Sequence, residues 1–256
     1  MAFFELPHFP AADSEEEHRR RDYFIAAFTF VTVTICLTTD GFAPQYFQYI
    51  LAVFGWLFLL AFLKDECKYV RTQVAVAVSF AVLGEFFASV YMQGYIYRFG
   101  NVPAYVPPGH GLVYLTAVAL GRSGLFQRHA RRIALLVVSL CGIWAAWGLS
   151  NWTQRQDLIG AVLFAVFLLY LFKGRSPTVY LGAFFITSWL EIVGTTAGTW
   201  AWAIIDPASK LPQGNPPSGV AAWYCLVDAV AIAGATPLLD IINRSVSFIR
   251  SQSRRY

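Results

Sequence analysis

Eight apolar runs without lysine or arginine, separated by short polar segments, constrain the fold of this chain more than any other feature. A helix needs about 20 mostly apolar residues to cross a bilayer. Soluble domains carry about 25 % charged residues, whereas charged residues here amount to 13 %. We therefore predict an all-α polytopic membrane protein of about eight transmembrane helices. The predicted spans are Tyr23–Thr39, Phe47–Leu63, Gln73–Tyr97, Gly111–Leu120, Ile133–Leu149, Leu158–Phe172, Val179–Ile205 and Gly219–Ile242.

The distribution of basic residues tests this number of spans, because Lys and Arg gather in cytoplasmic loops. With a cytoplasmic N-terminus and eight crossings, sixteen of the 19 Lys and Arg residues fall on the cytoplasmic side. Only Arg98, Arg155 and Lys210 fall on the other side. We predict that both termini are cytoplasmic and that the protein lies in the bacterial cytoplasmic (inner) membrane. The fourth run is short and fits either a crossing or a re-entrant helix.

Each half of the chain contains a glutamate within a span, then two aromatic residues two positions apart, then a Pro-Pro pair. The offsets between the halves are 106, 105 and 109 positions, which suggests an internal repeat. The residues are Glu85, Tyr95, Tyr97, Pro107 and Pro108 in the first half, and Glu191, Trp200, Trp202, Pro216 and Pro217 in the second. We predict two parallel four-helix repeats. The predicted segments are a cytoplasmic N-terminal segment (1–22), the first repeat (23–121), a basic cytoplasmic loop (122–132), the second repeat (133–242) and a basic cytoplasmic tail (243–256).

Three acidic residues fall inside the predicted spans. Glu85 and Glu191 lie near the middles of the third and seventh spans, and Asp228 lies nine residues into the eighth. An ionised acid at the bilayer centre costs about 2.5–3.5 kcal/mol on insertion scales, so such residues face the bundle interior and mark functional sites. Burial should keep them protonated at neutral pH. We predict that all three are catalytic; the alternative for each is a structural hydrogen bond.

One predicted helix face carries Glu191 together with small and aromatic residues. Positions i+3, i+4, i+7 and i+11 are Gly194, Thr195, Gly198 and Trp202, which share that face at helical spacing. The two glycines form a Gly-xxx-Gly pair, which permits close approach of a ligand or a second helix. We predict that these four residues bind substrate; the alternative is a helix–helix contact.

The aromatic residues Tyr95, Tyr97, Trp200 and Trp202 follow the two glutamates at the outer ends of their predicted spans. They fit an aromatic belt at the membrane interface or the roof of a cavity that both spans share. His110, in the loop after the first pair, is either an idle surface residue or part of the site. In the second interpretation all five residues bind substrate beside the acids.

The rarer residue types argue against several kinds of cofactor chemistry. The four cysteines have no Cys-x-x-Cys spacing, which argues against a zinc site or a disulfide framework. None of the four histidines lies inside a span, which argues against a haem held by helix histidines. Gly-rich phosphate-binding loops are missing. We therefore expect no cofactor and no metal. The net charge of +4 follows from the membrane topology and does not indicate nucleic-acid binding.

The second half of the chain resembles the membrane carotenoid-biosynthesis hydratase family over about 35 residues. The resemblance is carried by Glu191-x-x-Gly194-x-x-x-Gly198-x-Trp200-x-Trp202, followed by Leu211-Pro212, Gly219-Val220 and Trp223. This chain has Trp where the family has Tyr, and an additional Asn-Pro-Pro. Members of the family add water across an isoprenoid double bond without a known cofactor. The resemblance implies functional roles for Glu191, Gly194 and Gly198.

Three functions fit these observations. The first is an integral membrane enzyme that acts on a lipid-soluble, isoprenoid- or carotenoid-like substrate by carboxylic-acid proton transfer, in a hydration, isomerisation or cyclisation. Glu191 would donate the proton, and Asp228 or Glu85 would act as base or orient water. The second is a small transporter that uses the midplane glutamate pair, and the third is a non-catalytic membrane-complex subunit or assembly factor. As partners we expect membrane lipid, a lipid-soluble small molecule, and identical or different chains bound through helix faces.

Overall fold

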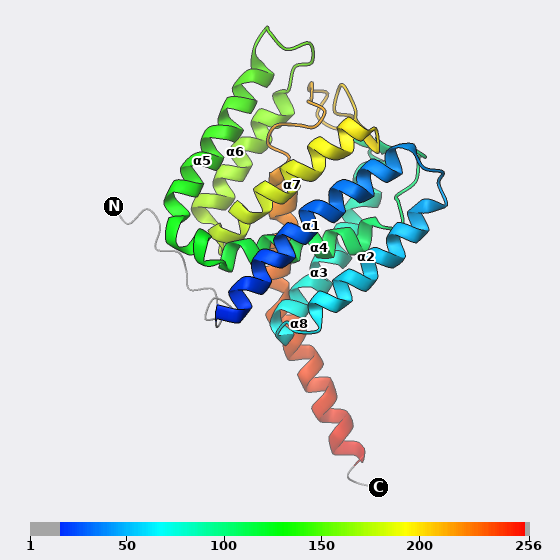
Figure 1. The fold of residues 1–256 in the computed structure, drawn as a ribbon, viewed down its shortest axis with the longest axis vertical. Helices are drawn as coiled ribbons and strands as arrows, with labels where there is room; N and C mark the ends of the chain where they lie inside the picture. Colours follow the sequence, from blue (N-terminus) through cyan, green and yellow to red (C-terminus); the bar gives the residue numbers. More distant parts are fainter. Residues whose placement is uncertain (1–15, 254–256) are drawn as a thin grey trace.

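Apolar helices make up almost all of the structure, a computed structural model that describes residues 16–253 (Figure 1). Residues 1–15 of the predicted N-terminal segment and 254–256 of the predicted tail lie outside the described residues. The described helices are α1 (Glu16–Phe42), α2 (Phe47–Leu63), α3 (Lys68–Glu85) with the π-helix η1 (Phe86–Tyr91), α4 (Val106–Arg122), α5 (Gly124–Leu149), α6 (Leu158–Lys173), α7 (Pro177–Ala197) and α8 (Ala221–Ser253). The prediction of an all-α protein is confirmed. Most of the predicted basic loop 122–132 forms the first turns of α5.

Five of these helices are long and apolar enough to cross a membrane, namely α1, α3 with η1, α5, α7 and α8. Helices α2 and α6 are apolar but shorter. Large apolar side chains such as Ile35, Leu60, Ile143 and Leu169 are more than half exposed on the outer faces of the bundle. Soluble proteins rarely expose wide apolar surface of this kind. These helices indicate a multi-pass integral membrane protein, and the side on which each loop lies stays a prediction.

Helix α4 lies at the centre of the bundle, where it packs against α1, α2, α3, α5 and α7 (Figure 1). Most of its residues are buried. Its contact with α7 is close because Gly182 has no side chain; a methyl group there would overlap the backbone oxygen of Ala117. The helices that carry the two glutamates, α3 and α7, are therefore both packed on α4.

The helices that carry the glutamates end earlier than predicted. Helix α3 changes at Glu85 into η1, and α7 ends at Ala197. Gly198 caps α7 with φ at 74°, a left-handed conformation that glycine adopts without steric cost. Both acids therefore lie six positions before the end of their helical segment, or roughly 9 Å at ~1.5 Å per residue. The prediction that both lie near the middle of a continuous span was wrong.

Two short strands stand where the sequence predicts helix. Strand β1 (Tyr95–Tyr97) pairs antiparallel with β2 (Trp200–Trp202), with Tyr95 opposite Trp202 and Tyr97 opposite Trp200. The two strands form backbone hydrogen bonds with each other, so their side chains can be as apolar as those of a helix. Short apolar runs do not distinguish the two, which is why the helix prediction failed for these six residues.

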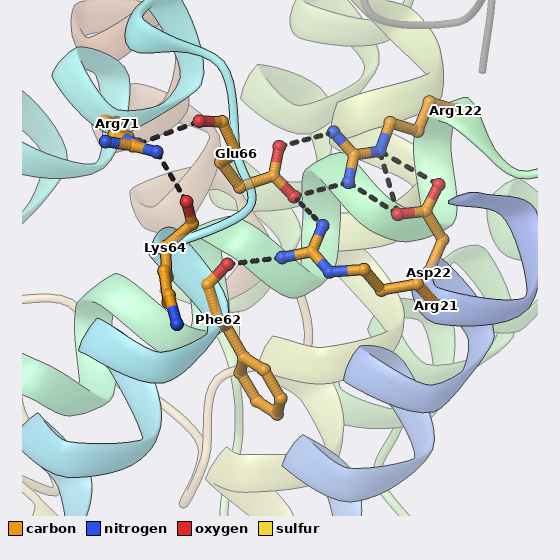
Figure 2. A network of polar contacts seen from close by, with 7 residues as sticks. All are labelled: Arg21, Asp22, Phe62, Lys64, Glu66, Arg71 and Arg122. Carbon is orange, nitrogen blue, oxygen red and sulfur yellow. Dashed lines mark hydrogen bonds and ion pairs between the residues drawn. The ribbon is translucent and has the colours of Figure 1, made fainter. Parts of the chain in front are cut away.

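A buried ionic network ties the bundle together near the start of α3 (Figure 2). Arg122, the last residue of α4, donates to Asp22 of α1 and to Glu66 in the α2–α3 connection, with N–O distances of 2.5 to 3.0 Å. Arg21 donates to the same Glu66 carboxylate at 2.6 Å. The side chains of Arg122, Asp22 and Glu66 are at most 1 % exposed. This network fixes α1 and the α2–α3 connection against α4.

Candidate functional site

Glu85, the last residue of α3, is buried and has three hydrogen-bond partners. The hydroxyl groups of Tyr95 and Tyr97 in β1 donate to its Oε2 atom, at 2.5 and 2.8 Å. Its Oε1 atom lies 2.8 Å from Nε2 of His110, in the second turn of α4. Three residues predicted to line the site therefore meet at one predicted catalytic acid.

Glu191, in α7, has a matching set of partners with different chemistry. The indole nitrogens of Trp200 and Trp202 both donate to its Oε2 atom at 3.0 Å. The hydroxyl group of Tyr224, near the start of α8, donates to Oε1 at 3.0 Å. Each glutamate is thus held by two aromatic side chains from the strand that follows it and one side chain from the next helix.

The strand pair places the two glutamates side by side. Tyr95 packs against Trp202 with ring centroids 4.8 Å apart, and Tyr97 packs against Trp200 at 5.9 Å. The rings of His110 and Tyr224 stack at 5.7 Å. The two carboxyl groups are linked through contacting rings, because Tyr95 donates to Glu85 and packs against Trp202, which donates to Glu191. We call this cluster the paired-acid centre; its members are Glu85, Tyr95, Tyr97, His110, Glu191, Trp200, Trp202 and Tyr224.

The aromatic side chains of the two strands cover the acids. Tyr97, Trp200 and Trp202 are each less than 10 % exposed, and all three, like the half-buried Tyr95, bond a glutamate. These contacts place the four residues beside the acids, and the roof of a shared cavity stays a prediction. His110 likewise contacts Glu85 and is not an idle surface residue.

The predicted face of Glu191 is only partly formed. Gly194 lies directly under the ring of Trp200, which a methyl group would overlap. Gly198 lies outside the helix as its cap, with open space around it, so the predicted Gly-xxx-Gly contact is not made by both glycines. The Thr195 hydroxyl donates to the backbone oxygen of Glu191 at 2.7 Å. Substrate binding by these residues stays a prediction.

Asp228 is buried one turn beyond Tyr224 on α8 and is separate from the centre. Within the described part of the chain, the hydrogen bonds to the Glu191 side chain come from two indoles and Tyr224, and none comes from Asp228. Its Oδ2 atom has no hydrogen-bond partner among the described residues. A direct contact between Asp228 and Glu191 is therefore not part of the site.

Sequence reasoning missed Tyr224, which completes the Glu191 set. The offset between the Pro-Pro pairs aligns His110 with Gly219, five positions before Tyr224. Helix α4 begins at Val106, before its Pro-Pro pair, whereas α8 begins at Ala221, after its own. Counted from the helix starts, His110 and Tyr224 are the fifth and fourth residues. The equivalence of His110 and Tyr224 becomes visible only once the first residues of α4 and α8 are known.

A supporting shell around the centre was also missed. Asp40, fully buried in the last turn of α1, accepts hydrogen bonds from Gln48 at 3.0 Å and from Tyr105 at 2.8 Å. Thr199, just before β2, donates to the backbone oxygen of Leu37 in α1 at 2.9 Å. Asp40 directly follows the first predicted span, where an acid is ordinarily solvated, so no sequence signal marks its burial.

Two arginines predicted on the outer side hold the backbone beside the strands. Arg98, next to β1, donates to the backbone oxygens of Asp40 and Ala43 at 2.5 and 2.9 Å. Arg155 donates to the backbone oxygens of Trp202 and Ala203, both at 2.7 Å. Both guanidinium groups thus bind backbone oxygens near the centre rather than its carboxylates.

The paired-acid centre joins two carboxyl groups, five aromatic rings and one imidazole. Within the described residues, neither glutamate forms an ion pair with Lys or Arg. Aromatic faces attract a cation that lies within about 6 Å of the ring centroid. An ionised carboxylate also attracts a cation. Among those residues, no group of three or more His, Cys, Asp or Glu side chains could hold a metal ion. Chemically, the arrangement can transfer a proton and stabilise a positive charge.

Comparison of the chain with protein-family models, curated proteins and solved structures finds no match.

Proposed function

We propose that this protein is an integral membrane enzyme that acts on a lipid-soluble, isoprenoid- or carotenoid-like substrate by proton transfer from a carboxylic acid. The observation that carries the proposal is the paired-acid centre, in which two buried carboxyl groups share one aromatic cluster. A carboxylic acid kept neutral in an apolar site can act as a proton donor, here to a carbon–carbon double bond. The aromatic faces and the second carboxyl group then stabilise the resulting carbocation.

The surroundings of Glu85 support a substrate that arrives from the lipid. The π-helix η1 starts directly after this residue and exposes the aromatic side chains Phe86, Phe87 and Tyr91. Single-turn π-helical segments occur frequently at functional sites. An apolar outer surface this near to an acid suits a polyene better than a polar solute. The resemblance around Glu191 to carotenoid hydratases points to the same class of substrate.

The proposal includes the finer membrane arrangement. The two matching sets of glutamate partners support two parallel repeats of four helices each, facing one another across β1 and β2. The ionic network gathers Arg21, Arg71 and Arg122 around Glu66 (Figure 2). Arg98 and Arg155 instead bind backbone oxygens beside the paired-acid centre. This distribution supports cytoplasmic termini in a bacterial inner membrane, with the paired-acid centre toward the opposite face.

The test uses purified protein in mild detergent with acyclic isoprenoid polyenes in buffer made with D₂O. The expected result is a product that has gained one C–D bond, with or without one added water, detected by mass spectrometry. Glu191→Gln should abolish deuterium incorporation because its amide is not an acid. Asp240→Asn, the same change at an exposed acid of α8, should leave it intact. Lipids extracted from the purified protein should include an enriched isoprenoid.

Three results would reject the enzyme. Absence of deuterium from every polyene, with only bulk phospholipid bound, would remove the isoprenoid site. Proton-dependent uptake into proteoliposomes that is lost in Glu85→Gln would instead identify a transporter, the function that a pair of membrane acids also suits. Stable co-purification of other chains, unaffected by either acid-to-amide change, would identify a non-catalytic subunit.

A further inference from the structure

We infer that His110 determines which acid of the paired-acid centre is ionised. His110 pairs as an imidazolium with an ionised Glu85, and Glu191 is the neutral acid with its proton on Oε1. This assignment deepens the function proposed above and relies on it only for the identity of the group that receives the proton. It makes His110 a positioning residue that decides which of two similar carboxyl groups can act as an acid.

The first step of the argument is the proximity of two buried carboxyl groups. Glu85 is 8 % exposed and Glu191 is 3 % exposed, and Tyr95, which binds Glu85, packs against Trp202, which binds Glu191. Two carboxylates that share a buried site disfavour each other's ionised form, so one of them keeps a proton. Two glutamates held alike would share that proton equally. The partners of each acid therefore decide where the proton resides.

The partners of the two acids differ in one respect that matters for charge. Glu85 lies 2.8 Å from the imidazole of His110, the one partner in either set that can become a cation near neutral pH. Glu191 is bound by two indoles and a phenol, which stay neutral. A carboxylate next to a cation is favoured over one next to neutral donors. The negative charge is therefore placed on Glu85 and the proton on Glu191.

The hydrogen bonds also locate the proton on one oxygen. Oε2 of Glu191 accepts from Trp200 and Trp202, and an indole N–H is a donor only. That oxygen is fully engaged as an acceptor. Oε1 faces the hydroxyl of Tyr224, which can donate or accept. The assignment therefore places the acidic proton on Oε1 and makes the Tyr224 oxygen its acceptor. Beside an ionised Glu191 the same hydroxyl would donate to Oε1 instead.

No other charged group of the described residues competes for His110. Nε2 of His110 contacts Glu85 of α3, and its ring stacks on Tyr224 of α8. Around these two contacts, Tyr95 and Tyr97 of β1 bind the same Glu85, and Tyr224 binds Glu191 of α7. Tyr105 of the α4 entry binds Asp40 of α1, and Arg98 binds backbone oxygens. The imidazolium thus has Glu85 as its counter-ion, and the ring of Tyr224 covers its face.

In the proposed hydration, Oε1–H of Glu191 breaks and its proton forms a C–H bond with the π electrons of a substrate double bond. The adjacent carbon becomes a cation between the new Glu191 carboxylate, Glu85 and the aromatic rings. A water oxygen then forms a C–O bond to that carbon. One water proton returns to Glu191, so the substrate gains one water and both acids regain their starting states. The ionised Glu85 is placed to orient that water.

The experiment is infrared spectroscopy of the purified wild-type protein in detergent at neutral pH, without substrate. Protonated carboxyl groups absorb apart from carboxylates, and Asp228→Asn identifies the band of Asp228, a buried acid whose Oδ2 atom has no hydrogen-bond partner among the described residues. The expected result is a second protonated-carboxyl band that Glu191→Gln removes and Glu85→Gln does not. Tyr224→Phe should shift the frequency of this band, because the hydrogen bond at Oε1 is lost.

His110→Gln provides the decisive comparison, since it removes the cation and keeps a hydrogen-bonding amide. An additional protonated-carboxyl band should appear, and the double variant with Glu85→Gln should lack it. His129→Gln, in α5 away from the centre, should leave the spectrum unchanged. If His110→Gln does not fold, the Glu191→Gln and Tyr224→Phe spectra decide alone. A wild-type band that disappears in Glu85→Gln instead of Glu191→Gln would overturn the assignment, even if deuterium incorporation succeeds.

Discussion

Gly194 is the position where a single added methyl group should disturb the centre most directly. Its Cα faces the six-membered ring of Trp200, and a Cβ atom would overlap three of the ring carbons. The indole would have to move, and its N–H bond to Glu191 would be lost. Overpacking of this kind costs about 1–3 kcal/mol. Inside α7, however, alanine is also favoured over glycine by about 1 kcal/mol.

Gly84→Ala separates these two effects. Gly84 also lies inside a helix that carries a site glutamate, and a Cβ atom there meets nothing within 4 Å. Its alanine variant therefore measures the helix preference alone. The free energy of unfolding of Gly194→Ala should be about 1–3 kcal/mol lower than that of Gly84→Ala. The assay is denaturant titration in mild detergent, followed by circular dichroism and by tryptophan fluorescence.

A double variant that also changes Trp200 provides a second check on the packing of its ring against Gly194. Trp200→Phe removes the outer ring that the new methyl group would overlap, so it should be less damaging in the Gly194→Ala background than in the wild type. Such non-additivity is expected for residues in contact. A Gly194→Ala variant as stable as Gly84→Ala, with unchanged fluorescence, would refute the packing of Trp200 on α7.

Three further predictions concern the stability of the scaffold, all measured by the same titration. Arg122→Met should lower the free energy of unfolding by about 3–5 kcal/mol, because it leaves buried carboxylates unpaired. Arg131→Met, at an exposed site of α5, should change that free energy by less than about 0.5 kcal/mol. Equal effects of the two variants would contradict a buried network. Burial by itself would raise the pKa of Glu66, but hydrogen bonds to Arg122 and Arg21 and their positive charges outweigh it and hold that pKa below 4.5. Because the pKa of Glu66 is lower in the folded than in the unfolded protein, its contribution to stability is fully present above pH 4.5 and is lost as pH falls through the folded pKa. Glu66→Gln should therefore reduce the fall of the unfolding free energy at acidic pH. An unchanged fall would argue against the ion pairs. Gly198→Ala should cost about 1–2 kcal/mol because of its left-handed backbone, and Gly198→Asn should cost less; equal costs would contradict that conformation.

Much of the site could be predicted from residue spacing. The two glutamates, the aromatic pairs two positions apart and His110 were all identified, and the structure brings them together. Spacing succeeds here because each acid and its aromatic partners lie within about a dozen positions of one another. Tyr224 escaped because an insertion before α8 shifts it relative to the Pro-Pro pair. Asp40 escaped because its partners, Gln48 and Tyr105, come from different parts of the chain.

The sequence by itself determined which segments are apolar and, outside β1 and β2, which are helical, since hydropathy is a local property of a run of residues. It also determined that acids occur within those runs, which is costly enough in lipid to require an internal environment. Tertiary structure alone decided how the acids are joined. The left-handed backbone of Gly198 ends α7, and the pairing of Tyr95 with Trp202 across the fold brings the two halves together. These contacts depend on residues more than a hundred positions apart, and local hydropathy contains no information about their pairing.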